Sequence, residues 1–430
     1  MQPDRSTPPP VLGFPHLVLP KPVIYDISPA MRLHVIEAAE SRANRVSVFW
    51  NYGSNRTQGQ STATELVPQM IMQGTSTMSA EEITDRIDFT GSFTGTSAGG
   101  DYTSVECLSL NAFTPEMLDI LFGILTQPVF PADRFEAIRR KVINNFELKQ
   151  TKSDFRAKEL LAELLAGAGH PYFRTTTYED IAATTIEQVR NCWHEGIHNT
   201  RIDVFACGRI TGDIEGKIVD FARNLSTVQG ELSNAEFHKY HPEEPGRRYI
   251  SMPDARQSAV AIGIPVDIDR SHPDYIPLRI AVTGLGGYFG SRLMSSIREE
   301  QGLTYGISAW LAGAPEGTSI QIAGACDAAY VEAVIEQTNI EIRKMAEAVM
   351  PEDEFNRLCS YYMTTLASVK ESFITIGKFY ESQLTVGIPD NYFDEQQHIL
   401  RELTPQKLRD VAAKYFLPEC EITVVAGRHV

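Results

Sequence analysis

The stretch Val129-Phe-Pro-Ala-Asp-Arg-Phe135 decides the architecture, because it returns later in the chain as Val349-Met-Pro-Glu-Asp-Glu-Phe355. Two further segments repeat in the same order and at nearly the same spacing, namely 185–190 with 404–409 and 204–209 with 423–428. Self-similarity at a constant spacing is typical of a duplicated structural unit. The sequence therefore predicts two copies of one unit in tandem.

The boundary between the copies is expected in residues 233–248, which are polar, rich in proline and glutamate, and without helical periodicity. We expect an extended N-terminal tail over residues 1–22, a first unit over residues 23–232 and a second unit over residues 249–430. A chain of 430 residues also exceeds what one hydrophobic core usually holds.

Within each copy, the order reads strand, strand, helix, helix, strand, then helices, then a last strand. Capping boxes at Ser79–Glu82 and Thr185–Gln188 mark two helix starts. The apolar pattern predicts strands over 45–52, 105–110 and 202–207, and helices over 80–89, 115–125, 131–148 and from 405. This order predicts an α+β fold of two homologous α/β sandwich units, each with an antiparallel-rich sheet and helices on one face.

Composition narrows the class of partner. The formal charge is −16 and the isoelectric point about 5.1, which argues against nucleic acid and suits a neutral or basic peptide. The longest apolar run, residues 118–130, is interrupted by Gly123 and Gln127, so no membrane span is expected. Six scattered cysteines without a CxxC motif indicate a reducing compartment. We expect the cytoplasm, or the periplasm if a signal peptide has been removed.

A second informative stretch is Gly286–Tyr305. A helix that ends at Arg298, a turn at Gly302 and a strand that carries Tyr305 would aim a guanidinium and a phenol at one cleft. A guanidinium binds carboxylates and carbonyls through two parallel hydrogen bonds. The alternative is that Arg298 pairs with a neighbouring glutamate on a solvated helix, while Tyr305 only packs.

This stretch resembles the second-half motif of the pitrilysin/insulinase metallopeptidases, in their processing-peptidase branch. The resemblance runs from about Pro22 to Gly427 and includes the pairs Gly74-Thr75 and His170-Pro171. It implies the processing-peptidase fold, which is that of the LuxS-like metallohydrolases. It also implies that Arg298 and Tyr305 contact the backbone of a peptide substrate.

The resemblance also implies where zinc would bind. The family carries an inverted HxxEH motif on a helix shortly before the Gly-Thr pair, and a further glutamate well downstream of it. Here the two histidine positions are Glu65 and Gln69, the general-base position is Pro68, and the last ligand falls on or next to Asn145. Glu147 could be a displaced ligand, but there is no histidine pair for it to complete. We therefore expect no catalytic residue and no metal in this chain, with zinc only if a partner subunit supplies it.

These observations predict a zinc-peptidase homologue that is non-catalytic, binding peptide or forming a chamber as a subunit of a peptidase. One alternative is half of an active heteromeric metallopeptidase whose partner supplies HxxEH. A second is a structural protein with a vestigial cleft. The expected partners are a peptide or unfolded polypeptide and, in a homo- or heterodimer, a related peptidase subunit.

Two other motifs are better explained by structure. His194-Glu-Gly-Ile-His198 matches the HExxH motif of zinc peptidases, but it lies near the end of the helix that starts at Thr185 and contains Gly196, a poor interior helix residue. The stretch 284–290 is glycine-rich, but Phe289 occupies the position of the third glycine of a dinucleotide loop.

Overall fold

The computed structural model describes residues 15–56, 61–167, 169–170, 176–225, 239–314 and 316–428. Residues 1–14 of the expected tail, Pro171 of the His-Pro pair and residues 233–238 of the expected linker lie outside this part. No helix among the described residues combines the length and hydrophobicity needed to cross a membrane.

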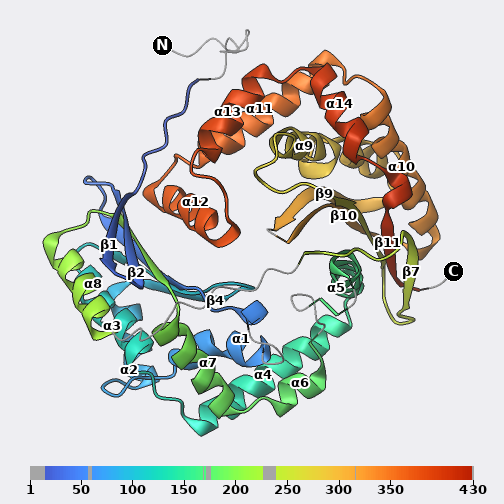
Figure 1. Cartoon of the computed structure of the whole chain (residues 1–430). Coiled ribbons are helices and arrows are strands. Elements are labelled where there is room, and N and C mark those ends of the chain that lie inside the picture. The colour runs from blue at the N-terminus through green and yellow to red at the C-terminus, as the bar shows by residue number, and fades with distance from the viewer. Residues whose placement is uncertain are drawn as a thin grey trace, which may run out of the picture.

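The described strands form two sheets with the same strand order, apart from an additional strand β1 in the first (Figure 1). The first sheet has the order β1-β2-β6-β3-β5-β4 and the second β7-β11-β8-β10-β9. Among these described strands, the one parallel pair of each sheet involves its last strand, β2 with β6 and β7 with β11. The strands are β1 (Val23–Ser28), β2 (Met31–Glu37), β3 (Ala43–Trp50), β4 (Phe93–Ala98), β5 (Thr103–Leu110), β6 (Ile202–Gly208), β7 (Gly246–Ser251), β8 (Ser258–Val266), β9 (Thr304–Ala314), β10 (Gly317–Cys326) and β11 (Ile422–Gly427).

Each half begins with strands and has helices between its strands, and its last strand, β6 or β11, follows a run of helices. In the first half they are α1 (Ser61–Ile71), α2 (Ala80–Thr90), α3 (Thr114–Thr126), α4 (Ala132–Gln150), α5 (Ser153–Ala166), α6 (Tyr178–Ala183), α7 (Ile186–Asn199) and α8 (Gly212–Asn224). In the second half they are α9 (Tyr275–Val282), α10 (Val331–Glu347), α11 (Glu352–Ser368), α12 (Phe373–Val386), α13 (Tyr392–Glu402) and α14 (Pro405–Tyr415). Shorter helical turns are η1 (Ser54–Arg56), η3 (Thr283–Gly287), η4 (Met294–Glu300), η5 (Ala328–Tyr330) and η6 (Pro418–Cys420).

Both predicted capping boxes are confirmed. At α2, the Glu82 amide donates to Ser79 Oγ over 3.1 Å, and the Ser79 amide donates to Glu82 Oε2 over 2.8 Å. At α7, Thr185 and Gln188 exchange the same two bonds over 3.3 and 2.8 Å. These bonds satisfy amides that an uncapped helix leaves without partners.

Two helices cross from one half to the other. Helix α5 of the first half packs on β8 and β11 of the second sheet, and α12 of the second half packs on β6 and β2 of the first sheet (Figure 1). The two helices are equivalent in the sequence repeat, because Ser153 and Ala166 at the ends of α5 correspond to Phe373 and Val386 at the ends of α12. Each sheet is therefore covered by helices of its own half on one face and by a helix of the other half on the opposite face.

Small residues make the first crossing possible. Leu161 and Leu165 of α5 pack against alanines 259 and 261 of β8. A Cβ atom added at Gly263 of β8 would lie 2.8 Å from Leu165 Cδ1, so a larger residue there would require the leucines of α5 to shift.

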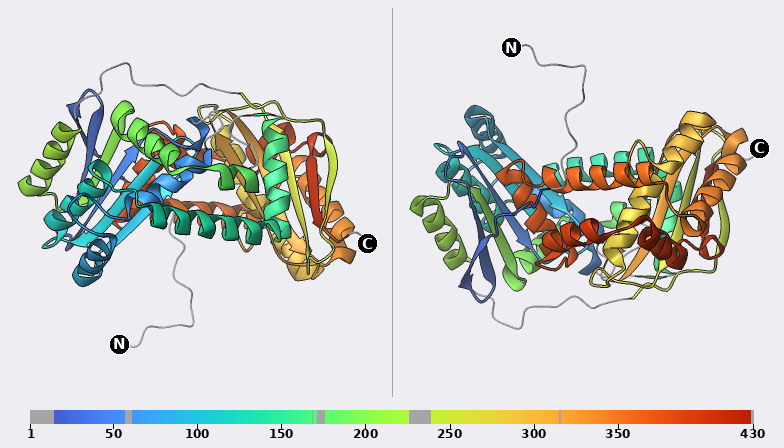
Figure 2. Two further views of the ribbon diagram at one scale, coloured as in Figure 1. Left: turned by 90° about the horizontal axis from the view of Figure 1, so that it is seen from below. Right: turned by 90° about the horizontal axis from the view of Figure 1, so that it is seen from above.

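The N-terminal segment makes a third crossing. The buried Gln397 of α13 accepts a hydrogen bond from the Leu17 amide over 2.8 Å and donates one to the Leu17 carbonyl over 2.9 Å. Leu19 is buried in the core of the second half. Residues 15–22 are therefore attached to the second half, and residues 246–248 of the expected linker belong to strand β7. Strand β7 thus takes up the last three residues of the range expected for the linker, because they pair with β11. Figure 2 shows the two halves from below and above, with long helices running between them.

Candidate functional site

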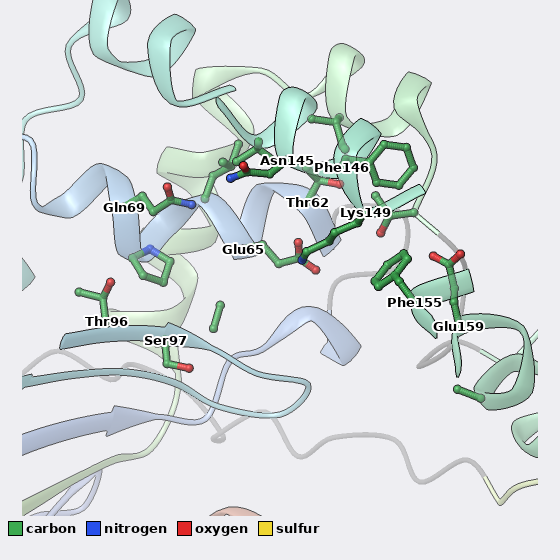
Figure 3. A pocket seen from close by; sticks show the side chains of 17 residues that line it. Thr62, Glu65, Gln69, Thr96, Ser97, Asn145, Phe146, Lys149, Phe155 and Glu159 are labelled. Carbon is green, nitrogen blue, oxygen red and sulfur yellow. The ribbon is translucent and has the colours of Figure 1, made fainter. Parts of the chain in front are cut away.

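A cavity of about 720 Å³ lies among α1, α4, α5 and the end of β4 (Figure 3). Its lining includes all four positions that the resemblance assigns to a zinc site: Glu65, Pro68 and Gln69 from α1, and Asn145 from α4. Positions on two helices that are far apart in sequence are thus brought together at one site. Glu147, the possible displaced ligand, does not line the cavity.

The side chains at these positions do not form a metal site. Gln69 and Asn145 present neutral amides, Pro68 has no ionisable group, and Glu65 is the one carboxylate among the four. Zinc in proteins is held by three or four imidazole, thiolate or carboxylate groups. Within the described part of the chain, no group of three or more histidine, cysteine, aspartate or glutamate side chains could hold a metal ion.

Helix α1 accommodates proline in its interior. Pro68 is buried within a helix that runs continuously from Ser61 to Ile71. Because proline lacks an amide hydrogen, one hydrogen bond of the helix is missing there. The helix nevertheless starts well before the proline, at Ser61. The apolar residues around Pro68, among them Leu66, Val67 and Met70, hold the helix in the first core.

The charge of Glu65 is disfavoured by its surroundings. Its side chain opens into the cavity and is accessible there, yet the surrounding protein atoms desolvate it and raise its pKa, while Lys149 acts in the opposite direction. Glu159 of α5, across the cavity, also has a pKa raised by desolvation. The site therefore holds two carboxyl groups whose negative charge is incompletely compensated.

Sequence reasoning missed three residues of this site: Lys149, Phe155 and Glu159. The Lys149 ammonium lies 5.7 Å from the centre of the Phe155 ring. The signal for Lys149 was available, because residues four apart share a helix face and Lys149 follows Asn145 by four. Phe155 and Glu159 lie on α5. This helix is positioned by its packing on the second sheet, and the sequence around it does not indicate that contact.

The HExxH motif lies elsewhere, on α7. The rings of His194 and His198 are 4.7 Å apart, and Glu195 accepts a hydrogen bond from Asn199 over 2.7 Å. Gly196 is inside the helix because a Cβ atom there would lie 2.8 Å from the indole of Trp50. No further described ligand completes a metal site at this pair. Tight helix packing thus explains the glycine of the motif.

Arg298 and Tyr305 are placed together by the second half. Arg298 lies in η4, Gly302 has a φ of +64°, and β9 begins at Thr304. The Arg298 guanidinium carbon lies 5.6 Å from the centre of the Tyr305 ring and 4.8 Å from that of Phe289. The tyrosine is 87% exposed. Neither Arg298 nor Tyr305 lines the cavity around Glu65.

Tyr305 is exposed because the strand bulges. In the ladder between β9 and β10, Gly306 pairs with Ala325 and Thr304 pairs with Cys326, which leaves Tyr305 without a partner. Thr304 Oγ1 accepts the Gly306 amide over 3.1 Å and so stabilises the irregularity. An extra residue in a ladder turns its side chain away from the regular alternation. The motif therefore presents its phenol to solvent.

The sequence of this chain is similar to proteins of one peptidase family. Residues 183–362 match the family model described as the peptidase M16 inactive domain. An uncharacterized zinc protease of Streptomyces coelicolor is 21% identical over 392 residues, which cover 88% of this chain and 84% of that protein. A non-peptidase homologue, YmxG of Helicobacter pylori, is 21% identical over 66% of this chain and 64% of that protein.

Solved structures show the same fold. The peptidase M16 inactive domain from Pseudomonas fluorescens superposes with a TM-score of 0.85 at 20% identity, covering 95% of this chain and 98% of that one. A protease from Helicobacter pylori gives a TM-score of 0.84 at 16% identity, covering 95% and 100%. These matches confirm the resemblance drawn from the sequence, and the solved structures show that the chain has the fold of the M16 inactive domain. The inactive-domain match and the non-peptidase relative support the expectation that it is not active alone.

Proposed function

We propose that this chain is a non-catalytic, peptide-binding subunit of an M16-type assembly. One observation carries the proposal: the cavity that would hold zinc is open and about 720 Å³ in volume, but its ligand positions carry Glu65, Gln69 and Asn145. A cavity of this size with a few polar groups is typical of a ligand site. Loss of the ligands removes hydrolysis without filling the space.

The sheet edge beside the cavity supports a peptide as the ligand. Strand β4 is the edge of the first sheet, and Thr96, Ser97 and Ala98 at its end line the cavity. An edge strand offers unpaired backbone groups along one side, and an extended peptide can pair with them as an added strand. A peptide bound in this way would direct alternate side chains toward Glu65 and Glu159.

Arg298 and Tyr305 provide the second part of the proposed site. In the related peptidases, the corresponding pair contacts the substrate backbone, and here both side chains are presented together at the start of β9. We propose that they face peptide held between the two halves or in a chamber shared with a related subunit. The partner would be a second copy or a subunit that carries HxxEH.

The proposed compartment is the cytoplasm, on the basis of six free cysteines. The periplasmic protease PqqL of Escherichia coli has the same fold, with a TM-score of 0.76, and marks the periplasm as the alternative.

Affinity purification of the chain from its source cell, followed by zinc analysis and mass spectrometry, tests the assembly. Co-purification of a zinc-bearing subunit with intact HxxEH supports the active heteromeric peptidase as the assembly. Recovery of the chain with peptides and no zinc subunit supports the purely binding role. Recovery of neither peptide nor related subunit contradicts the proposal and favours a structural protein with a vestigial cleft.

Arg298→Ala tests the site within that assembly. Loss of a charged hydrogen-bond donor costs about 1.5–3 kcal/mol, so peptide binding, or cleavage with a zinc-bearing partner, should fall roughly ten- to a hundredfold. Arg343→Ala is the matched control, because Arg343 is an exposed arginine of α10 in the same half. Equal behaviour of both variants would show that Arg298 is structural.

A further inference from the structure

Arg298 differs from its neighbours in having no acidic partner. Among the residues that the structure describes, none forms a hydrogen bond or ion pair with its guanidinium. Earlier on the same stretch, Arg292 is bound by Glu354 through two hydrogen bonds of 2.7 and 3.2 Å. Glu299 and Glu300 follow Arg298 directly and are exposed, but neither pairs with it. The expectation of a simple surface ion pair is therefore not met.

Two exposed aromatic rings hold the guanidinium in place of a carboxylate. The ring centres of Phe289 and Tyr305 lie 4.8 and 5.6 Å from the guanidinium carbon, and the two side chains are 63% and 87% exposed. Rings stack on a guanidinium through its faces and leave the N–H groups at its edge available. Phe289 thus belongs to the site, although the sequence motif drew attention only to Arg298 and Tyr305.

The free N–H groups of the Arg298 guanidinium favour one kind of ligand group. Parallel N–H donors match the two oxygens of a carboxylate, whereas a peptide carbonyl offers one oxygen to the same pair of donors. The chain carries 55 acidic residues, and none in the described part occupies this guanidinium. A carboxylate is thus the group that this site accepts best and that the protein itself does not provide.

We propose that Arg298, Phe289 and Tyr305 form a receptor for the C-terminal carboxylate of a bound peptide. Arg298 holds the carboxylate through two hydrogen bonds, the exposed Tyr305 hydroxyl can donate another, and Phe289 positions the guanidinium. This inference rests on the proposed peptide-binding function and adds the part of the ligand that is recognised. It predicts selection for peptides with a free end, such as the products of earlier proteolysis.

The test uses the tag-free full chain and a mixed library of nonapeptides made twice, as free acids and as C-terminal amides. Mass spectrometry identifies the retained peptides, and fluorescence anisotropy then measures the Kd of each acid and amide pair. The acids should bind about tenfold or more tightly than the amides, in line with a charge-assisted hydrogen bond. Arg298→Lys, which keeps the charge but loses the paired donors, should lower this ratio, because a lysine ammonium binds a carboxylate only as a point charge.

Two further variants distinguish a role of Phe289 in positioning Arg298 from a general loss of structure. Phe289→Leu should weaken acid binding about two- to fivefold while leaving amide binding unchanged, because it removes one exposed cation–π contact. Arg343→Lys should change nothing. Thermal unfolding of each variant checks that the fold is kept.

The outcomes distinguish this inference from the function on which it rests. Equal binding of acids and amides, weakened equally by Arg298→Lys, overturns the carboxylate receptor and leaves the backbone contact in place. An acid preference that Arg298→Lys leaves undiminished also overturns it, since the carboxylate is then bound elsewhere. Failure of the wild-type chain to retain any peptide overturns the peptide-binding function and this inference together.

Discussion

Glu65 lies where the resemblance places a zinc-binding histidine, and its surroundings disfavour its charge. Desolvation by the surrounding protein raises its pKa, and Lys149 only partly offsets this. A carboxyl group whose pKa is raised on folding favours the folded state in its protonated form. Stability is thus lost as the pH rises through the unfolded and then the folded pKa, and the cost is complete at neutral pH.

Glu65→Gln should therefore raise the Tm at pH 7, and the gain should disappear as the pH falls below the ordinary glutamate range of about 4.3. The measurement is thermal unfolding of both proteins across the range from acidic to neutral pH.

Glu81→Gln is the control of opposite sign. A backbone hydrogen bond at the start of α2, and then Arg134, lower the pKa of Glu81, so this carboxylate stabilises the fold at neutral pH and the effect is lost as the pH falls. Its replacement should lower the Tm at pH 7. A Tm of the Glu65→Gln variant that stays below wild type at pH 7 would contradict this description of the cavity.

At the scale of elements, α12 is attached to the first sheet by a buried polar cluster. Glu381 of α12 accepts hydrogen bonds of 2.5 and 3.0 Å from Arg45 of β3, and one from Ser47. Arg45 also binds Glu106 of β5. Arg45 and Glu381 are 4% and 6% exposed. A buried ion pair adds little net stability, but removal of one partner leaves a buried charge, which costs several kcal/mol.

Glu381→Ala should destabilise the protein by about 3 kcal/mol, toward the lower end of the range for a broken buried pair because Glu106 still binds Arg45. The control is Glu116→Ala, which breaks the exposed pair of Glu116 with Arg86 and should change stability far less, because solvent screens such a pair. Chemical denaturation of both variants makes the comparison. Equal, small effects would show that α12 does not depend on this cluster.

Sequence patterns predicted individual elements well where the signal is local. The capping boxes at Ser79 and Thr185 placed two helix starts within a residue, because the bonds involve residues only three apart. The local apolar pattern likewise predicted β6, a buried strand. It missed β7, whose exposed and half-buried side chains follow a polar segment. Local composition cannot show that a strand will pair with β11, which lies far away in sequence.

The candidate site, too, could be predicted from the sequence only in part. Counting from a known motif led to Glu65, Pro68, Gln69 and Asn145, and the structure gathers them around one cavity. It could not lead to Glu159, because α5 reaches this place through its packing on the other half. An apolar helix face indicates burial but does not identify the surface that covers it.

On the scale of the whole molecule, the halves hold each other through α5, α12 and the N-terminal segment. Leu161 and Leu165 are buried in a cluster with residues of β8 and β11, and Ile36 and Phe205 of the first sheet belong to the core of the second half. Separate domains with a boundary at residues 233–248 stay a prediction. Because α5 and α12 each pack on the sheet of the other half, neither half alone covers both faces of its own sheet.

Cleavage within residues 233–248 should therefore leave the two fragments together. We expect limited proteolysis to nick the chain there first, and size-exclusion chromatography to recover both fragments in one peak at the original volume. Glu381→Ala should make the nicked pair separate more readily in mild denaturant. Fragments that separate spontaneously, or a first cut within residues 118–146, would contradict the described exchange.

The central proposal is that this chain, which is similar to the M16 peptidases, has a cavity at the position of their zinc site but holds no metal there. The most direct measurement is the zinc content of the tag-free chain after incubation with excess zinc and exhaustive dialysis. The substitutions at Glu65, Pro68, Gln69 and Asn145 predict far less than one zinc per chain, for the wild type and for His194→Ala alike. One tightly held zinc per chain would contradict the claim, and its loss in His194→Ala would assign the metal to the HExxH motif of α7.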